Sequence, residues 1–246
     1  MIVLAHLSDT HFDGSERNAE RAARVLAYLN ELPGPIDAVL VTGDIADHGL
    51  PAEYEEARKV LSSPHRMLFC PGNHDVRRPY REVLLGVSGG DEPVNEVHRV
   101  GGAVVAMCDS SIPGQADGLL ADETIAWLST VLAQAPSDAP VFIAFHHPPA
   151  ILHSPFIDRI RQHGADRLAD LVRRHPQVVA LLCGHAHTPA ATTFAGRPLL
   201  VAPGVVSLLR LPWEHGPVLD YGPPPAVAFH ILDDGWRLTT HYRVVT

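Results

Sequence analysis

The stretch Met67-Leu68-Phe69-Cys70-Pro71-Gly72-Asn73-His74-Asp75 organises the chain around a point where a strand ends. Its first four residues are apolar, and Pro71-Gly72 follows them as a turn follows a buried strand. Asn73 then offers an amide oxygen to a hard cation, and His74 offers a titratable nitrogen. A turn at a strand terminus can direct both side chains into one crevice. The stretch predicts a buried strand leading into a functional turn, although so short a motif also fits an Asn turn beside a surface histidine.

Apolar runs and helical repeats alternate on either side of this stretch, as they do in α/β folds. Before it lie two strand–loop–helix units, with strands at residues 2–7 and 36–42 and helices that begin near Glu16 and Pro51. After it the pattern predicts hairpins as well as helices, so antiparallel strands should join the sheet. The later elements expected are a short helix at 79–85, a hairpin at 94–108, helices at 122–134 and 165–175, strands at 141–145 and 178–182, and hairpins that turn at 195–197 and 233–235.

Length and composition indicate a single globular domain over residues 1–246. Hydrophobic residues make up 46% of the chain and charged residues 19%, and no low-complexity tract or linker divides it. The net charge of -9 and the lack of a lysine or arginine run argue against binding nucleic acid or an anionic membrane. For the Pro- and Gly-rich segment 203–225, three roles are open: flanking the active site, forming an oligomer contact, or serving as an inert surface loop.

The N-terminus and the cysteines favour a cytoplasmic location. An apolar strand begins at Ile2 without a signal-peptide pattern before it, and no apolar run reaches the roughly 18 residues of a membrane span. Cys70, Cys108 and Cys183 lie in or beside apolar strands and lack C-x-x-C spacing. We expect them to be buried free thiols in a reducing compartment.

Oxygen and imidazole side chains follow the apolar strands at several places along the chain. Because the carboxyl ends of parallel strands share one edge of a sheet, these side chains should converge in one crevice. In the Asp-x-His and His-x-His pairs, extended backbone would direct both side chains to the same side. The residues are Asp9, His11, Asp44, Asn73, His146, His185 and His187.

So many ligands suit two metal ions rather than one tetrahedral zinc, with a carboxylate bridging both. A mixture of imidazole, carboxylate and amide oxygen favours iron, manganese, zinc or cobalt over calcium. Two such ions, about 3.5–4 Å apart, lower the pKa of a bound water toward about 7 and hold the attacking and leaving oxygens at phosphorus. The ligand set therefore predicts hydrolysis of a phosphoester.

In their order along the chain, these motifs resemble the five blocks of the calcineurin-like metallophosphoesterase superfamily. The blocks are Asp9-x-His11, Gly43-Asp44, Gly72-Asn73-His74-Asp75, His146 and Gly184-His185-x-His187. The resemblance implies a four-layer α/β fold, in which a mixed β-sandwich is flanked by helices and the metal site lies at the carboxyl ends of strands.

The same resemblance implies roles for individual residues. It gives two ligand sets that share one residue: Asp9, His11 and His187 for one metal, Asn73, His146 and His185 for the other, and Asp44 bridging both. It makes His74 the group that contacts the scissile phosphate and protonates the leaving oxygen. Asp47 could fix the His74 ring by accepting a hydrogen bond, or could merely cap its loop.

Three neighbouring residues are expected to have structural roles. His147 follows a ligand position and, in extended backbone, would point the opposite way, which suggests a packing or surface role. His6 lies in the middle of a strand and is expected to be a satisfied core histidine. Asp75 is expected to stabilise its turn.

The sequences G-D-I-A-D, G-N-H-D and G-H-x-H, with Phe12 after His11, are similar to those of bacterial class III cyclic nucleotide phosphodiesterases and their glycerophosphodiesterase relatives. This resemblance implies hydrolysis of a small-molecule phosphodiester, a 3′,5′-cyclic nucleotide with cyclic AMP first, by in-line attack of a hydroxide that bridges the metals. The alternatives are a broader enzyme for glycerophosphodiesters or other phosphoesters, and a metal-free scaffold, which the complete ligand set disfavours. The resemblance also suggests a dimer or higher oligomer. No segment indicates a nucleobase pocket.

Overall fold

Two β-sheets face each other in the computed structural model, which describes residues 1–246. The first sheet contains, in spatial order, β15 (Leu238–Val244), β14 (Ala226–Leu232), β1 (Ile2–Leu7), β2 (Ala38–Thr42) and β3 (Met67–Cys70). The second contains β10 (Ala190–Phe194), β11 (Arg197–Val201), β9 (Val178–Cys183), β7 (Val141–Ala144), β5 (Ala103–Met107) and β4 (Glu96–Val100). Strands β1, β2 and β3 run parallel, as do β5, β7, β9 and β11, while β14, β15, β4 and β10 supply the antiparallel pairings.

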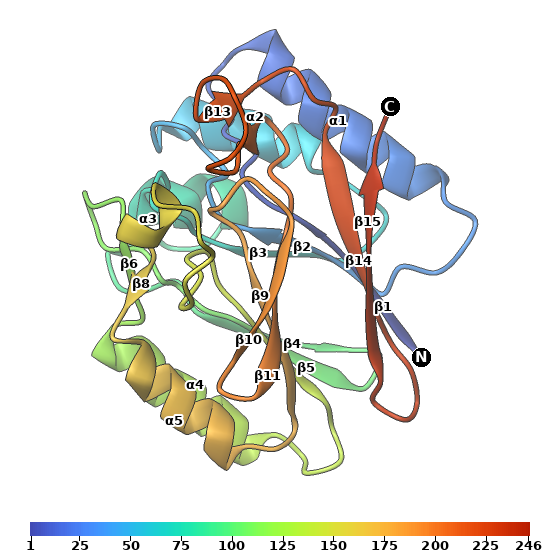
Figure 1. Ribbon diagram of the computed structural model, residues 1–246, viewed down its shortest axis with the longest axis vertical. Coiled ribbons are helices and arrows are strands. Elements are labelled where there is room, and N and C mark those ends of the chain that lie inside the picture. The colour runs from blue at the N-terminus through green and yellow to red at the C-terminus, as the bar shows by residue number, and fades with distance from the viewer.

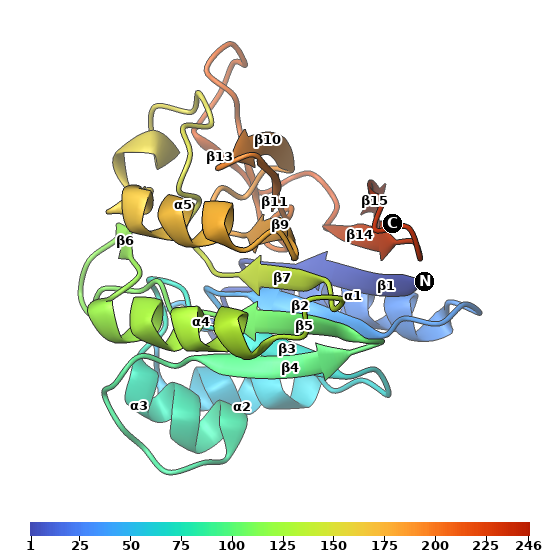
Figure 2. The same cartoon turned by 90° about the horizontal axis from the view of Figure 1, so that it is seen from below.

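Helices cover the outer face of each sheet. The first sheet packs against α1 (Glu16–Glu31) and α2 (Pro51–Val60), and the second against α4 (Asp122–Gln134) and α5 (Ala165–Arg174). Figure 1 shows these two helix pairs on opposite sides of the strands, and Figure 2 shows α4 and α5 side by side in front of them. The shorter elements are α3 (Arg77–Pro79), which continues into a π-helical turn at Tyr80–Leu85, a 3₁₀ turn at Ile157–Arg159, and the paired strands β6 (Gly118–Leu119) with β8 (Gln162–His163) and β12 (Leu208–Leu209) with β13 (Leu219–Asp220).

The alternation of side chains along the buried strands produces these layers. In β2, Val39 and Val41 pack toward the helices, while Leu40 packs toward the other sheet. In β7, Ile143 packs toward its helices and Phe142 into the space between the sheets. Successive residues of a strand point to opposite faces, so a continuous apolar run is what a strand buried on both faces requires. The predicted helix–sheet–sheet–helix arrangement is confirmed.

The expected core histidine is also confirmed. His6 is fully buried, with Nε2 2.8 Å from Thr42 Oγ1 and Nδ1 3.0 Å from Nε2 of His230. His230 in turn contacts Thr240 Oγ1 at 2.9 Å, so both rings have hydrogen-bond partners. Burial lowers the pKa of His6 well below its usual value and the pKa of His230 to about 3, so both imidazoles are neutral at pH 7.

Every helix in the fold is too short or too polar to cross a lipid bilayer.

Candidate functional site

The polar residues that follow the parallel strands converge at one edge of the sandwich. The loops after β1, β2 and β3 approach the loops after β7 and β9, which belong to the other sheet. Three groups of side chains there have their ligand atoms within 4.8 Å of one another. Their members are Asp9, His11, Asp44 and His187; His146, His147 and His185; and His11, Asp47 and His74. The predicted convergence of Asp9, His11, Asp44, His146, His185 and His187 is therefore present, and Asn73 lies beside His147.

Two glycines allow the loops to approach this closely. A Cβ atom on Gly43 would lie 2.5 Å from Nδ1 of His146, and one on Gly72 would lie 2.2 Å from Oδ1 of Asp44. No real Cβ atom tolerates such contacts, so the glycine before Asp44 and the glycine before Asn73 are required by packing. The main-chain N–H of His74 donates to Asp44 Oδ1 at 2.9 Å and joins the two loops.

The backbone of the site differs from the expected extended conformation. Asp9 and His11 have φ values of 58° and 38°, and His185 and His187 have φ values of 68° and 49°. These left-handed residues make each Asp-x-His or His-x-His segment a tight turn, so extended geometry was the wrong reason for their convergence. Asp and His adopt this region more readily than most residues, but such a conformation still costs about 1–3 kcal/mol each.

The first group surrounds a buried carboxylate that lacks hydrogen-bond partners. Oδ1 of Asp9 lies 3.3 Å from Nε2 of His187, and neither carboxylate oxygen of Asp9 accepts a hydrogen bond. Burial raises the pKa of Asp9, but the charges of His187 and His146 outweigh this effect and lower the pKa to about 2. An ionised carboxylate buried without donors is costly, and a bound cation would satisfy it.

The second group contains Asp44 and the histidines of β7 and β9. Nε2 of His146 lies 3.2 Å from Asp44 Oδ2 and 3.2 Å from Nδ1 of His185. Burial lowers the pKa of His146, but the charge of Asp44 raises it to about 9. Burial and the neighbouring His146 lower the pKa of His185 to about 3. Oδ2 of Asp44 also lies 3.6 Å from Nε2 of His11, so this carboxylate stands between the two groups.

Each histidine uses one ring nitrogen to hold the surrounding protein. His11 Nδ1 donates to Asp47 Oδ1 at 2.8 Å, and His146 Nδ1 donates to the Thr42 carbonyl at 2.6 Å. On the other strand ends, His185 Nε2 donates to the Ile160 carbonyl at 3.1 Å. These acceptors hold a proton on one ring nitrogen, so the opposite nitrogen is the one that can lose its proton and offer a lone pair to a metal ion. A donor set of imidazole nitrogens and carboxylate oxygens suits transition-metal ions.

His74 and Asp47 contact each other differently from the expectation. His74 donates its Nδ1 proton to the main-chain carbonyl of Asp47 at 2.7 Å, whereas the Asp47 carboxylate lies 3.6 Å from that nitrogen. The carboxylate instead accepts from His11, and that hydrogen bond holds the pKa of Asp47 below its usual value. His74 remains 41% exposed and packs edge-on against the His11 ring. Its Nε2 is left for a ligand in the cleft.

His147 is buried, which agrees with the packing role and excludes the surface role, but it points toward the site and not away from it as expected. The side chain is fully buried, and Nε2 lies 3.1 Å from Oδ1 of Asn73. Ser110 Oγ accepts the main-chain N–H of His147 at 3.2 Å and lies 2.8 Å from Nδ1 of the ring. The hydroxyl proton of Ser110 therefore goes to Nδ1, and Nε2 carries the proton donated to Asn73. The second histidine of the His-His pair was the only signal of this role in the sequence.

Asp75 has a wider structural role than stabilising its own turn. Its buried carboxylate accepts the N–H of Gly72 at 2.8 Å and those of Ile45 and Ala46 at 3.2 and 3.1 Å. The hydroxyl of Tyr54 donates to it at 3.0 Å. Burial raises the pKa of Asp75 to about 6, although the main-chain hydrogen bonds oppose this shift. The residue ties the loop after β2 to the loop after β3.

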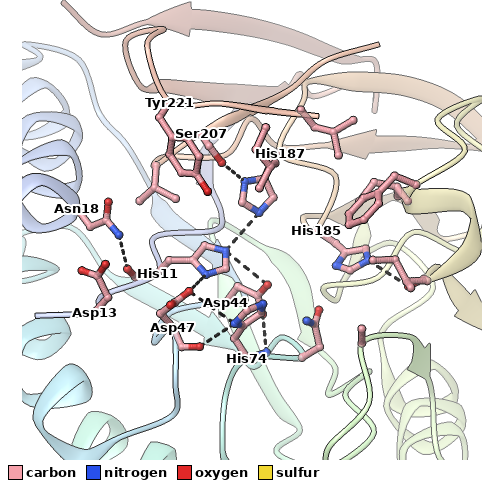
Figure 3. A pocket seen from close by; sticks show the side chains of 18 residues that line it. His11, Asp13, Asn18, Asp44, Asp47, His74, His185, His187, Ser207 and Tyr221 are labelled. Atoms are coloured by element: carbon pink, nitrogen blue, oxygen red, sulfur yellow. Dashed lines mark hydrogen bonds and ion pairs between the residues drawn. The ribbon is translucent and has the colours of Figure 1, made fainter. Parts of the chain in front are cut away.

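A cleft of about 370 Å³ opens onto the cluster (Figure 3). Its lining combines polar residues of the cluster with apolar side chains, most of them from the segments 156–160 and 206–221. The segment 203–225 supplies part of this lining, and Oγ of Ser207 lies 2.7 Å from Nδ1 of His187. Of its three expected roles, this segment therefore flanks the site; an oligomer contact stays a prediction. Sequence reasoning missed Ser207, because no motif marks it.

Comparison with known proteins is consistent with this geometry. The sequence model of the calcineurin-like phosphoesterases matches residues 2–189. A glycerophosphodiester phosphodiesterase of Enterobacter lignolyticus is 34% identical, over 98% of this chain and 91% of its own length. A probable cyclic nucleotide phosphodiesterase of Rhodococcus erythropolis is 34% identical, over 81% of this chain and 69% of its own length. The structure of a dimetal phosphatase from Danio rerio superposes with a TM-score of 0.76, 13% identity and coverage of 100% and 96% of the two chains, which is a likeness of fold.

Proposed function

The chain belongs to the calcineurin-like phosphoesterase family and is a metal-dependent phosphoester hydrolase, and we propose that its substrate is a 3′,5′-cyclic nucleotide, with cyclic AMP the first to test. Members of this family use two divalent metal ions, which when bound activate water and offset charge at phosphorus. The His and Asp groups described above have the chemistry to hold them.

The proposed ligand sets follow from the two groups. One ion would be held by Asp9, His11 and His187, the other by Asn73, His146 and His185, and Asp44 would contact both. The unpartnered carboxylate of Asp9 supports the first set. The position of Asp44 Oδ2 within 3.6 Å of His11 and 3.2 Å of His146 supports its shared role.

His74 is the proposed general acid. Its Nδ1 proton is held by the Asp47 carbonyl, which fixes the ring while leaving Nε2 in the cleft. A protonated His74 can give the Nε2 proton to the leaving alkoxide as the P–O bond breaks. Asp47 acts on this step through its main chain, and its carboxylate orients His11.

The residues that line the cleft support a phosphodiester rather than a phosphomonoester as the substrate. Its lining includes the carboxylates of Asp13, Asp44 and Asp47 and contains no lysine or arginine. A phosphomonoester is close to a dianion at pH 7, because its second pKa is about 6, whereas a diester carries one negative charge. Because the lining offers no lysine or arginine to compensate the additional charge, the cleft favours diesters. The apolar side chains in the lining of the cleft favour a substrate with an apolar group, such as a nucleobase.

A cytoplasmic location is part of this proposal. Cys70, Cys108 and Cys183 are all buried and unpaired, as expected for a protein that folds in a reducing compartment.

Initial rates would test the proposal with protein freed of metal by a chelator and reloaded with Mn²⁺. The substrates are cyclic AMP, glycerophosphoethanolamine, bis(p-nitrophenyl) phosphate and p-nitrophenyl phosphate. We expect metal-dependent turnover of cyclic AMP, with the monoester the poorest substrate. Asn73→Ala should lower kcat/KM at least about 100-fold, since even residues that only orient metal ligands typically contribute 10–100-fold. His241→Ala, at an exposed position of β15, is the matched control and should behave as wild type.

The outcomes separate the possible substrates. Cleavage of glycerophosphoethanolamine with no cleavage of cyclic AMP would overturn the nucleotide proposal and retain the diesterase. Preference for p-nitrophenyl phosphate over both diesters would overturn the argument from cleft charge.

A further inference from the structure

Two aromatic side chains in the lining of the cleft are unusually exposed. Phe156 is 46% exposed and Tyr221 is 55% exposed, and both line the cleft that reaches His74 and the metal-binding groups. They come from segments far apart in sequence, so no local motif predicts them. The other apolar residues of the cleft lining are Ala116, Ile157, Ile160, Val206, Leu209 and Leu219. Aromatic surface left in a concave site is typical of a place where a ligand binds.

Tyr221 is held in position from helix α1. Arg17 donates to the main-chain carbonyl of Tyr221 at 2.6 Å, and its guanidinium carbon lies 5.3 Å from the centre of the Tyr221 ring. Arg21 donates to the carbonyl of Pro223 at 2.7 Å, two residues further along. Figure 3 shows the Tyr221 ring at the cleft, on the same side as His11 and His187. A ring fixed in this way loses little entropy when a ligand packs on it.

We propose that Tyr221 and Phe156 form a stacking subsite for the nucleobase of the substrate. This inference rests on the proposed function for the kind of substrate. A purine has two apolar faces, which aromatic rings bind by stacking, while the phosphate of the nucleotide would lie at the metal-binding groups of the same cleft. Stacking does not distinguish one purine from another, so the subsite selects nucleotides over base-free diesters and accepts adenine and guanine similarly.

The test measures inhibition constants, which do not require that the inhibitor is hydrolysed. Hydrolysis of bis(p-nitrophenyl) phosphate by Mn²⁺-loaded protein is the reporter. The inhibitors are cyclic AMP and methyl riboside 3′,5′-cyclic phosphate, which has the same cyclic diester without a base. In Tyr221→Ala we expect the inhibition constant of cyclic AMP to rise about tenfold, and that of the base-free compound to stay constant.

Matched variants make the result specific. Phe156→Ala should reproduce the effect, and Tyr221→Phe should not, because it retains the ring. Trp213→Ala removes an aromatic ring of the same segment that is 72% exposed but does not line the cleft, and it should have no effect. An unchanged constant for cyclic AMP in both alanine variants, or an equal loss for the base-free compound, would overturn the subsite. If cyclic AMP inhibits through Tyr221 without being cleaved, the subsite stands and the proposed substrate is wrong.

Discussion

Replacing Gly118 by alanine should displace His147 and loosen the site around Asn73. A Cβ atom on Gly118 would lie 2.3 Å from Cγ of the His147 ring and 2.5 Å from Nδ1, against an ordinary contact distance of at least 3.4 Å. The ring would have to move by about 1 Å, which the hydrogen bonds to Ser110 and Asn73, at 2.8 and 3.1 Å, cannot follow without breaking. Overpacking of this kind costs about 1–3 kcal/mol of stability.

The functional consequence concerns the metal that Asn73 is proposed to hold. Loss of a residue that orients a ligand typically weakens metal binding 10–100-fold, so we expect the affinity for one of two Mn²⁺ ions to fall about tenfold, or about 1.4 kcal/mol.

Calorimetric titration of the metal-free protein with Mn²⁺ measures this change, and thermal unfolding checks that the variant is folded. Gly34→Ala is the matched control, because Gly34 has open space around it and no left-handed φ. Two Mn²⁺ ions bound by Gly118→Ala as tightly as by Gly34→Ala would refute the role of His147. His147→Ala, which removes the ring without overpacking, should give the same loss of Mn²⁺ affinity. If it does not, the loss in Gly118→Ala is a purely steric effect of the added methyl group.

Three further outcomes are expected. Lowering the pH from 7 to 5 should reduce the free energy of unfolding by about 2 kcal/mol through His230 alone. The pKa of His230 is about 3 in the folded state and about 6.5 in the unfolded state, so only the unfolded state takes up the proton in this range. His6 acts in the same direction. Urea unfolding of the metal-free wild type and of His230→Gln at several pH values measures how the free energy of unfolding changes with pH. The same pH dependence in both proteins would contradict the role of His230. His74→Ala should lower kcat for cyclic AMP about 100-fold or more but have little effect on bis(p-nitrophenyl) phosphate, whose leaving group needs no proton; equal losses in a steady-state assay would exclude the general-acid role. Tyr54→Phe removes the hydroxyl that donates to Asp75 and accepts the N–H of Val76, and should destabilise the protein by about 1–3 kcal/mol in thermal unfolding; an unchanged melting temperature would show that water replaces it.

The layers of the fold could be predicted because burial leaves a simple pattern in the sequence. Strands such as β2 and β7 are buried on both faces, so they appear as continuous apolar runs. The convergence of the site followed from the same information, since parallel strands place their carboxyl ends together. The first strand was predicted at residues 2–7, as observed for β1. The second was predicted at 36–42, whereas β2 begins at Ala38.

The surroundings of the site could not be predicted, because they depend on contacts between segments far apart in the chain. His147 contacts Asn73 across 74 residues, and Ser207 contacts His187 from the 203–225 segment. The partner of His74 was correctly sought at Asp47, but the main chain rather than the carboxylate makes the hydrogen bond. Side-chain identity carries no information about such a carbonyl, because every residue has one.

The left-handed backbone at Asp9, His11, Asp44, His185 and His187 links the fold to its chemistry. At about 1–3 kcal/mol each, such residues together store strain comparable with the 5–15 kcal/mol by which a typical domain is stable. Main-chain hydrogen bonds hold them there: the N–H of Asp9 donates to the carbonyl of Gly43 at 3.1 Å, and that of His11 to the carbonyl of Asp44 at 2.9 Å. These hydrogen bonds hold the strained residues within the loops themselves, so the ligand side chains are positioned by the fold. A site organised in this way binds with less loss of entropy than one assembled around the ion.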